Sequence, residues 1–137
     1  IDKSTFTREL VQASGAFALC IPGRTLADLT YTVGSESGRE AGDKFERFGI
    51  ATFAGPVLGL PLVEGCVGWL ECRVIQEVHN EQRYDLFIAE VVAAWADPTV
   101  FSNGRWHFGD DAKRTIHYVA GGAFFETGKP FEVDAGR

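Results

Sequence analysis

The chain has 137 residues, of which 45% are hydrophobic and 23% charged, and its formal net charge at pH 7 is −6. This length and composition are typical of one folded domain and exclude a disordered chain. The acidic balance argues against sequence-independent nucleic-acid binding, and no apolar run reaches the roughly 18 residues that a membrane-spanning helix needs. We therefore expect a soluble, cytoplasmic protein with no nucleic-acid or membrane partner.

The beginning of the chain predicts a short helix followed by a strand. Small polar residues precede a helical stretch that Gly15 ends, which are the usual start and stop signals of a helix of two to three turns. The run Ala16–Ile21 is apolar throughout and is closed by Pro22, so it predicts a buried strand. Apolar spacing then predicts helices over 25–33 and 43–48, with a polar loop over 34–38.

The second half of the chain is dominated by strand patterns. Two long patterns over 67–78 and 84–95 are joined by a short polar connector over 79–83, which predicts an antiparallel hairpin. The second of them is apolar on both faces, as a central strand is. Shorter strands are predicted over 50–53, 106–108, 116–119 and 123–125. The expected fold class is mainly β with short α helices, arranged as a small antiparallel barrel.

Charged and thiol side chains inside these strands need an explanation of their own. Glu71 and Glu90 lie within apolar strands, and a buried carboxylate needs a partner, for which Arg73 is the candidate. The cysteines show no metal-ligand spacing, so we expect three reduced, mostly buried thiols and no metal site. The alternative is a reactive thiol at Cys72, which alone has a cation beside it in sequence; on a strand, however, that cation points to the opposite face.

Three segments could carry chemistry, each with an ordinary structural interpretation beside the functional one. Residues 2–7 combine a lysine with three hydroxyls at a helix start, where an anion such as phosphate can bind, although residue types alone favour a plain helix cap. Residues 35–45 offer two cations beside glycines, or simply a flexible loop. Residues 114–125 place Arg, His and Tyr beside Gly-Gly and two phenylalanines, which suits a planar aromatic ligand or a glycine bulge in a strand.

Taken together, these segments resemble the flavin reductase-like family, the FMN-binding split barrels. Each piece alone is weak, and the resemblance is carried by the order and spacing of all of them across nearly the whole chain: residues 2–11, 14–22, 37–39, 43–45, 49–50, 61–66, 70–73 and 87–91. The resemblance implies a split barrel, usually a homodimer, that holds FMN non-covalently near the subunit interface. No catalytic triad or metalloprotease motif competes with this interpretation.

The resemblance also assigns candidate cofactor-binding residues. Lys3, Ser4, Thr5 and Thr7 belong to the phosphate and ribityl region, and Ser37, Arg39 and Lys44 align with a further cofactor-side loop. Tyr84 occupies a place where relatives often carry a histidine, and His117 and Phe124 fall in the C-terminal segment that approaches the flavin. No residue is assigned a catalytic role, since the flavin carries the chemistry.

In function, the resemblance implies an FMN-dependent oxidoreductase that passes a hydride from NADH or NADPH to flavin, with a monooxygenase or another acceptor downstream. Two alternatives remain at this point. One is a flavin-binding electron carrier without reductase activity, and the other is a barrel subunit that dimerises and binds no cofactor. In the family pattern Ile1 falls at the end of a strand, so we also expect that the family's N-terminal strands are absent from this chain and that its barrel is incomplete or completed by a partner.

Overall fold

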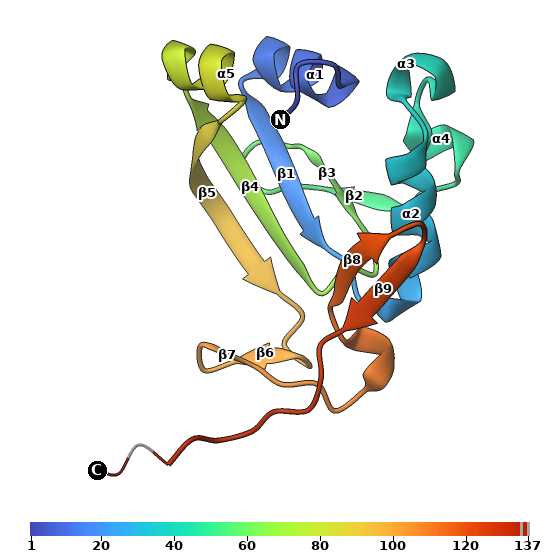
Figure 1. Ribbon diagram of the computed structural model, residues 1–137, viewed down its shortest axis with the longest axis vertical. Helices are drawn as coiled ribbons and strands as arrows, with labels where there is room; N and C mark the ends of the chain where they lie inside the picture. The colour runs from blue at the N-terminus through green and yellow to red at the C-terminus, as the bar shows by residue number, and fades with distance from the viewer. Residues whose placement is uncertain (135, 137) are drawn as a thin grey trace.

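The structure, a computed structural model, describes residues 1–134 and 136 and is built around a three-stranded antiparallel sheet in the order β1-β4-β5 (Figure 1). Its strands are β1 (Ala16–Ile21), β4 (Gly68–Ile75) and β5 (Ile88–Ala96). All three were predicted, β1 from an apolar run and β4 and β5 from two long strand patterns. The register shifts between Glu71 and Cys72, where β5 contributes one extra residue, Val92.

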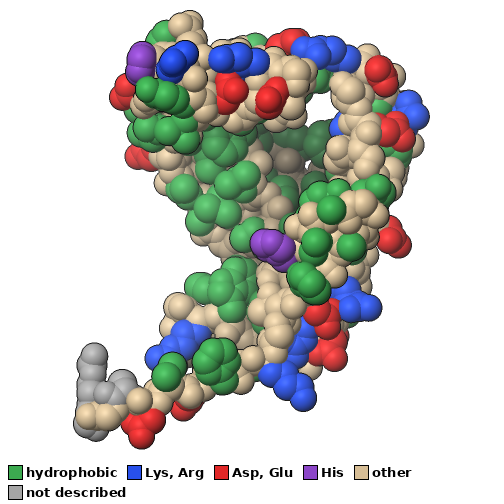
Figure 2. Space-filling model, viewed as in Figure 1, with side chains coloured by type: hydrophobic (Ala, Val, Ile, Leu, Met, Phe, Trp, Pro, Cys, Tyr) green, Lys and Arg blue, Asp and Glu red, His purple; other side chains and the backbone are tan. Residues whose placement is uncertain are grey.

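The positions of β4 and β5 in the sheet differ from the prediction. Among the residues described, β4 lies between two strands, whereas β5 pairs with β4 alone and is an edge strand. Ile88 and Val91 on β5 are 41% and 49% exposed, although its pattern predicted a strand covered on both faces. The apolar residues on both faces of β5 therefore leave an apolar surface exposed on this strand. Figure 2 shows hydrophobic side chains gathered over the sheet.

The connector between β4 and β5 is helical rather than the short polar turn predicted over 79–83. It forms α5 (Val78–Tyr84), which Asp85 ends in the left-handed region at φ 56°. The helix begins where the Glu81 carboxylate accepts the Glu77 N–H at 3.0 Å, a capping contact that polar composition alone did not reveal. The predicted N-terminal helix is confirmed as α1 (Phe6–Ser14), and the two helices lie at the same end of the sheet (Figure 1).

A separate small hairpin, β2 (Thr52–Ala54) with β3 (Pro61–Val63), is held to the sheet by a buried carboxylate. Glu71 on β4 is fully buried, and its Oε2 and Oε1 accept the N–H groups of Val57 and Leu58, each at 2.9 Å. The prediction that Arg73 is its partner is wrong, because both carboxylate oxygens are taken by backbone N–H groups, and Arg73 is exposed and lies opposite Glu90 on β5. Glu90 is exposed, not buried.

Short helices occupy one side of the sheet (Figure 1). The helix predicted over 25–33 is a 3-10 turn, η1 (Arg24–Leu26), followed by α2 (Ala27–Ser35), and the one predicted over 43–48 is α4 (Lys44–Arg47). Between them α3 (Gly38–Ala41) begins at the end of the stretch predicted as a polar loop. The Ser37 hydroxyl accepts the Arg39 N–H at 3.3 Å and so caps this single turn.

The C-terminal part consists of two small hairpins. The first is β6 (Phe101–Ser102) with β7 (Arg105–Trp106), and the second is β8 (Ile116–Ala120) with β9 (Ala123–Glu126), which confirms the strands predicted over 116–119 and 123–125. A 3-10 turn, η2 (Asp111–Lys113), lies between them. The β8–β9 hairpin lies beside α2 (Figure 1), and Tyr31 of α2 reaches Tyr118 of β8 with 6.4 Å between ring centroids.

The buried apolar residues are few and come from α1, β3, the two residues before β4, the middle of β4, and the segment after β5: Val11, Leu62, Cys66, Val67, Cys72 and Val100. Stacked aromatic rings extend this core, with Trp69 and Trp95 paired across β4 and β5 at 6.2 Å. No helix in the described part of the chain is both long and apolar enough to cross a membrane.

An ion pair at the end of β5 predicts a stability change at low pH. Lys113 Nζ donates to Asp97 at 2.7 Å, and this bond, with those from Thr99, lowers the pKa of Asp97 from 3.8 to about 2. Because the pKa is lower in the folded state, the carboxylate stabilises the fold above pH 3.8, and this contribution is lost as the pH falls toward 2. In urea unfolding from pH 7 to pH 2, we expect the difference between the wild type and Asp97→Asn to vanish over that window. A difference that stays constant with pH would contradict this account.

Candidate functional site

The start of α1 holds the first group of predicted site residues in a compact turn. Thr5 caps the helix, with its Oγ1 accepting the Arg8 N–H at 3.4 Å, and the Ser4 N–H donates to Asp2 Oδ1 at 2.7 Å. Thr7 follows in the exposed first turn of the helix. The first-turn N–H groups of a helix have no partner within it, so this end of α1 offers donors to an anion.

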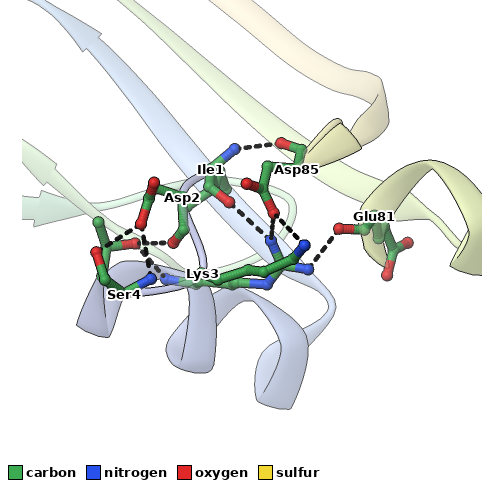
Figure 3. A network of polar contacts seen from close by, with 8 residues as sticks. Ile1, Asp2, Lys3, Ser4, Glu81 and Asp85 are labelled. Carbon is green, nitrogen blue, oxygen red and sulfur yellow. Dashed lines mark hydrogen bonds and ion pairs between the residues drawn. The ribbon is translucent and has the colours of Figure 1, made fainter. Parts of the chain in front are cut away.

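Lys3 lies next to a polar network that sequence reasoning missed (Figure 3). Its Nζ is 3.7 Å from Asp85 Oδ1, and the same oxygen accepts a 2.6 Å bond from the buried guanidinium of Arg8. Arg8 also donates to the carbonyls of Ile1 and Glu81, so it joins the N-terminal segment to α5. The signal available in the sequence was the three-residue spacing of Arg8 and Val11, which are the buried residues of α1.

The second predicted segment meets the first through Arg39. Its Nη1 donates to the Ser4 carbonyl at 3.0 Å, its Nη2 pairs with Glu9, and the guanidinium lies 5.8 Å from the centre of the Phe6 ring. A methyl group on Gly38 would stand 2.8 Å from the Phe6 ring, so glycine permits this close approach. The structure thus brings Ser4 and Arg39 together although 35 residues separate them.

Lys44 and Tyr84 lie apart from this contact. Lys44 Nζ donates to the carbonyls of Val33 and Glu36, at the end of α2, where a cation complements the helix dipole. Tyr84 ends α5 with 63% of its surface exposed, and its ring stands edge-on to His79 at 5.6 Å. Within the described part of the chain, neither side chain forms a hydrogen bond or an ion pair with another predicted site residue.

The third predicted segment forms one wall of a cavity of about 400 Å³ between α2 and the β8–β9 hairpin. Phe124 lines the cavity, whereas His117 is exposed on β8 opposite Phe125. The lining combines aromatic rings with charges and includes Tyr31, which sequence reasoning did not select because it lies off the apolar face predicted for its helix. The cavity is lined by Arg24, Ala27, Asp28, Tyr31, Ile116, Gly122, Phe124, Phe125 and Glu126.

Comparison with known proteins now identifies the family. The model of the flavin reductase like domain matches residues 1–117. The chain belongs to this family. Its members are flavin-binding oxidoreductases, and the resemblance drawn from the sequence is confirmed.

Three relatives illustrate the similarity. The Escherichia coli (strain K12) protein YddH, which is uncharacterized, is 47% identical over 130 residues, covering 94% of this chain and 68% of YddH. The crystal structure of an FMN-binding domain of a flavin reductases-like enzyme from Shewanella baltica OS155 has 43% identity and a TM-score of 0.93, covering 98% of this chain and 71% of that one. Flavoredoxin of Desulfovibrio vulgaris (Miyazaki F) has 22% identity and a TM-score of 0.79, over 98% of this chain and 70% of its own.

These structures also confirm the predicted fold. The chain is mainly β with short helices, and its structural neighbours are split barrels of the flavin reductase family. The sheet β1-β4-β5 and the small hairpins around it are the part of that architecture which the described residues contain. The residues predicted to bind the cofactor remain predictions.

Proposed function

We propose that this protein binds FMN non-covalently and transfers a hydride to it from NADH or NADPH. The observation that carries the proposal is the contact of Arg39 with the Ser4 carbonyl at 3.0 Å, which joins two separately predicted segments at the start of α1. Support comes from the FMN-binding domain of Shewanella baltica OS155, which is 43% identical and has nearly the same fold.

The arrangement of donors and rings fits the shape of FMN. The groups proposed to bind the phosphate, Ser37 and Arg39, lie shortly after the end of α2. Ala27 and Asp28, at the start of α2, line the aromatic cavity. The two groups are therefore separated by a helix of nine residues, roughly 13 Å long. FMN carries a phosphate at one end, a planar ring at the other and a polar chain between them. Its two ends can therefore each meet one of the two separated groups of residues.

In this proposal each group of residues has a physical task. Arg39 and Lys3 supply positive charge for the phosphate, and the hydroxyls of Ser4, Thr7 and Ser37 supply hydrogen bonds. Phe124, with Tyr31 opposite, offers apolar surface to the ring and keeps water from it. When bound, the flavin supplies the redox chemistry by accepting a hydride at its N5 atom. Lys44, Tyr84 and His117 stay candidates without an assigned contact.

Binding and reduction of flavin test this function directly. We expect purified protein to retain FMN, and a hundredfold excess of FMN over Kd to raise the free energy of unfolding by about 2.7 kcal/mol. Under anaerobic conditions, NADH or NADPH should bleach the visible absorbance of the bound flavin. Binding without bleaching by either nucleotide would favour the electron-carrier alternative, and no effect of FMN on thermal stability would contradict flavin binding.

We further propose that the protein acts as a homodimer and delivers reducing equivalents to a monooxygenase or another acceptor. Support for the dimer comes from the apolar residues left open on the sheet, among them Leu19 at 51% and Val91 at 49% exposure. Sedimentation equilibrium at several concentrations tests it, and a monomer at all of them would exclude it. We also retain the cytoplasmic location and the absence of nucleic-acid and membrane partners as part of the proposal.

A further inference from the structure

Asp85 lies between two cations that come from a distant part of the sequence (Figure 3). Its Oδ1 atom accepts a hydrogen bond from Arg8 Nη1 at 2.6 Å, and the same atom is 3.7 Å from Lys3 Nζ. Asp85 directly follows α5, whereas Lys3 precedes α1 and Arg8 belongs to it. The carboxylate therefore joins the cation proposed to attract the phosphate to a second, buried cation.

Arg8 holds this carboxylate in place. Only 7% of the Arg8 side chain is exposed, and besides Asp85 it binds the carbonyls of Ile1 and Glu81. Its guanidinium also lies 5.1 Å from the centre of the Phe87 ring. A planar guanidinium with three acceptors and an aromatic neighbour has little freedom to move. The position of Asp85 Oδ1 is therefore set by a buried group of the protein.

Lys3, in contrast, has a flexible side chain that is 58% exposed. A lysine loses much rotamer freedom when its ammonium group is fixed. A carboxylate that already holds the ammonium group near one position reduces the freedom that phosphate binding has to remove. The charges permit this role, because Arg8 offsets the negative charge of Asp85. Two cations and one carboxylate leave one net positive charge for the phosphate.

We propose that Asp85 is a positioning residue for Lys3, which it holds where the phosphate of FMN binds, while Arg8 offsets the charge of the carboxylate. This inference rests on the proposed binding of FMN at the start of α1 and adds the residues that order its cation. Asp85 acts through Lys3 and not through a contact of its own with the phosphate. In a purely structural role, Asp85 would only tie α5 to α1 through Arg8.

Asp85→Asn tests the proposal with little disturbance of the fold. Asparagine has nearly the same shape, keeps an oxygen acceptor for Arg8, and readily adopts the left-handed backbone found at this position, φ 56°. In fluorescence titrations of the full chain, we expect FMN to bind about threefold more weakly and riboflavin, which lacks the phosphate, to bind as it does to the wild type. A carboxylate that merely stood near the phosphate would act in the opposite direction, since its removal would strengthen FMN binding. An unchanged or stronger affinity for FMN, or an equal loss for both ligands, would overturn the proposal.

Removing Lys3 shows whether Asp85 acts through it. In a Lys3→Gln background, Asp85→Asn should no longer weaken FMN binding, because the side chain that the carboxylate orders is absent. A threefold loss that persists without Lys3 would contradict the positioning role. Asp134→Asn is the matched control, because it removes the same charge from an exposed position in the C-terminal segment and should leave both affinities unchanged.

A second variant covers the case in which Asp85→Asn does not fold, which circular dichroism shows. Asp85→Glu keeps the charge but moves it by one methylene group, so it should weaken FMN binding in the presence of Lys3 and not in Lys3→Gln. A wild type that binds neither ligand would refute the proposed function together with this inference. A wild type that binds FMN, with a ratio of FMN to riboflavin Kd values that the Asp85 variants leave unchanged, would refute the positioning role alone.

Discussion

Replacing Glu71 by alanine is expected to lower the free energy of unfolding by about 3 kcal/mol. The carboxylate is fully buried and accepts two backbone N–H groups, from Val57 and Leu58, each at 2.9 Å. Alanine would leave both donors without their partner in the interior, and each unsatisfied buried donor costs roughly 1–3 kcal/mol. Urea denaturation measures the loss as a lower midpoint with an unchanged slope.

Two further variants separate burial from charge. Glu90→Ala removes the same side chain from the neighbouring strand at an exposed position, so it should change stability by less than about 0.5 kcal/mol. Glu71→Gln keeps one acceptor oxygen but presents an amide N–H₂ to the other backbone donor. The free energy of unfolding that it loses should lie between the losses of the two alanine variants. If Glu71→Ala and Glu90→Ala cost the same, the anchoring role of Glu71 is wrong.

Lys3→Glu is expected to weaken FMN binding about tenfold while changing riboflavin binding by less than about twofold. FMN and riboflavin share the ring and the polar chain, and only FMN carries the phosphate that the cation is proposed to attract. The reversed charge would also stand beside Asp85, whose carboxylate lies 3.7 Å from Lys3 Nζ, and this adds negative potential where the phosphate is proposed to bind. Fluorescence titration of both ligands gives the ratio of the two Kd values.

A matched charge reversal controls for the net charge of the protein. Lys129 is exposed in the C-terminal segment, outside the candidate site, so Lys129→Glu should leave both affinities unchanged. Equal losses for FMN and riboflavin in Lys3→Glu would place Lys3 away from the phosphate. Circular dichroism of each variant shows whether a loss of binding reflects a loss of fold.

Local signals in the sequence predicted several elements well. The apolar run closed by Pro22 is β1, and the cap residue Thr5 and the stop residue Gly15 bound α1 where helix signals placed them. The predictions failed where a contact with residues distant in the sequence determines the local structure. Polarity over 79–83 predicted a turn, yet α5 forms there, with Arg8 of α1 donating to its Glu81 carbonyl.

The candidate site shows the same division. Residue types and their order were enough to select Ser4 and Arg39, but their contact depends on how α3 folds back onto α1. Tyr31 could not be selected from its own neighbours, because its role comes from the β8–β9 hairpin that packs beside α2. The three-residue spacing of Arg8 from Val11 could have indicated that Arg8 is buried. It was missed because arginine side chains are mostly exposed in folded proteins.

By itself, the sequence determined the family, the mainly β fold and the segments from which a flavin site is proposed, because capping residues, apolar runs and motif order are local properties. Only the tertiary structure decided which of these segments touch, and that Glu71 binds backbone N–H groups in place of Arg73. The physical reason is that hydrogen-bond partners and burial depend on neighbours brought together by sheet pairing across dozens of residues. The net charge of −6 excluded a broad basic surface, and the fold then brought Arg39 to the start of α1, where we propose that the phosphate binds.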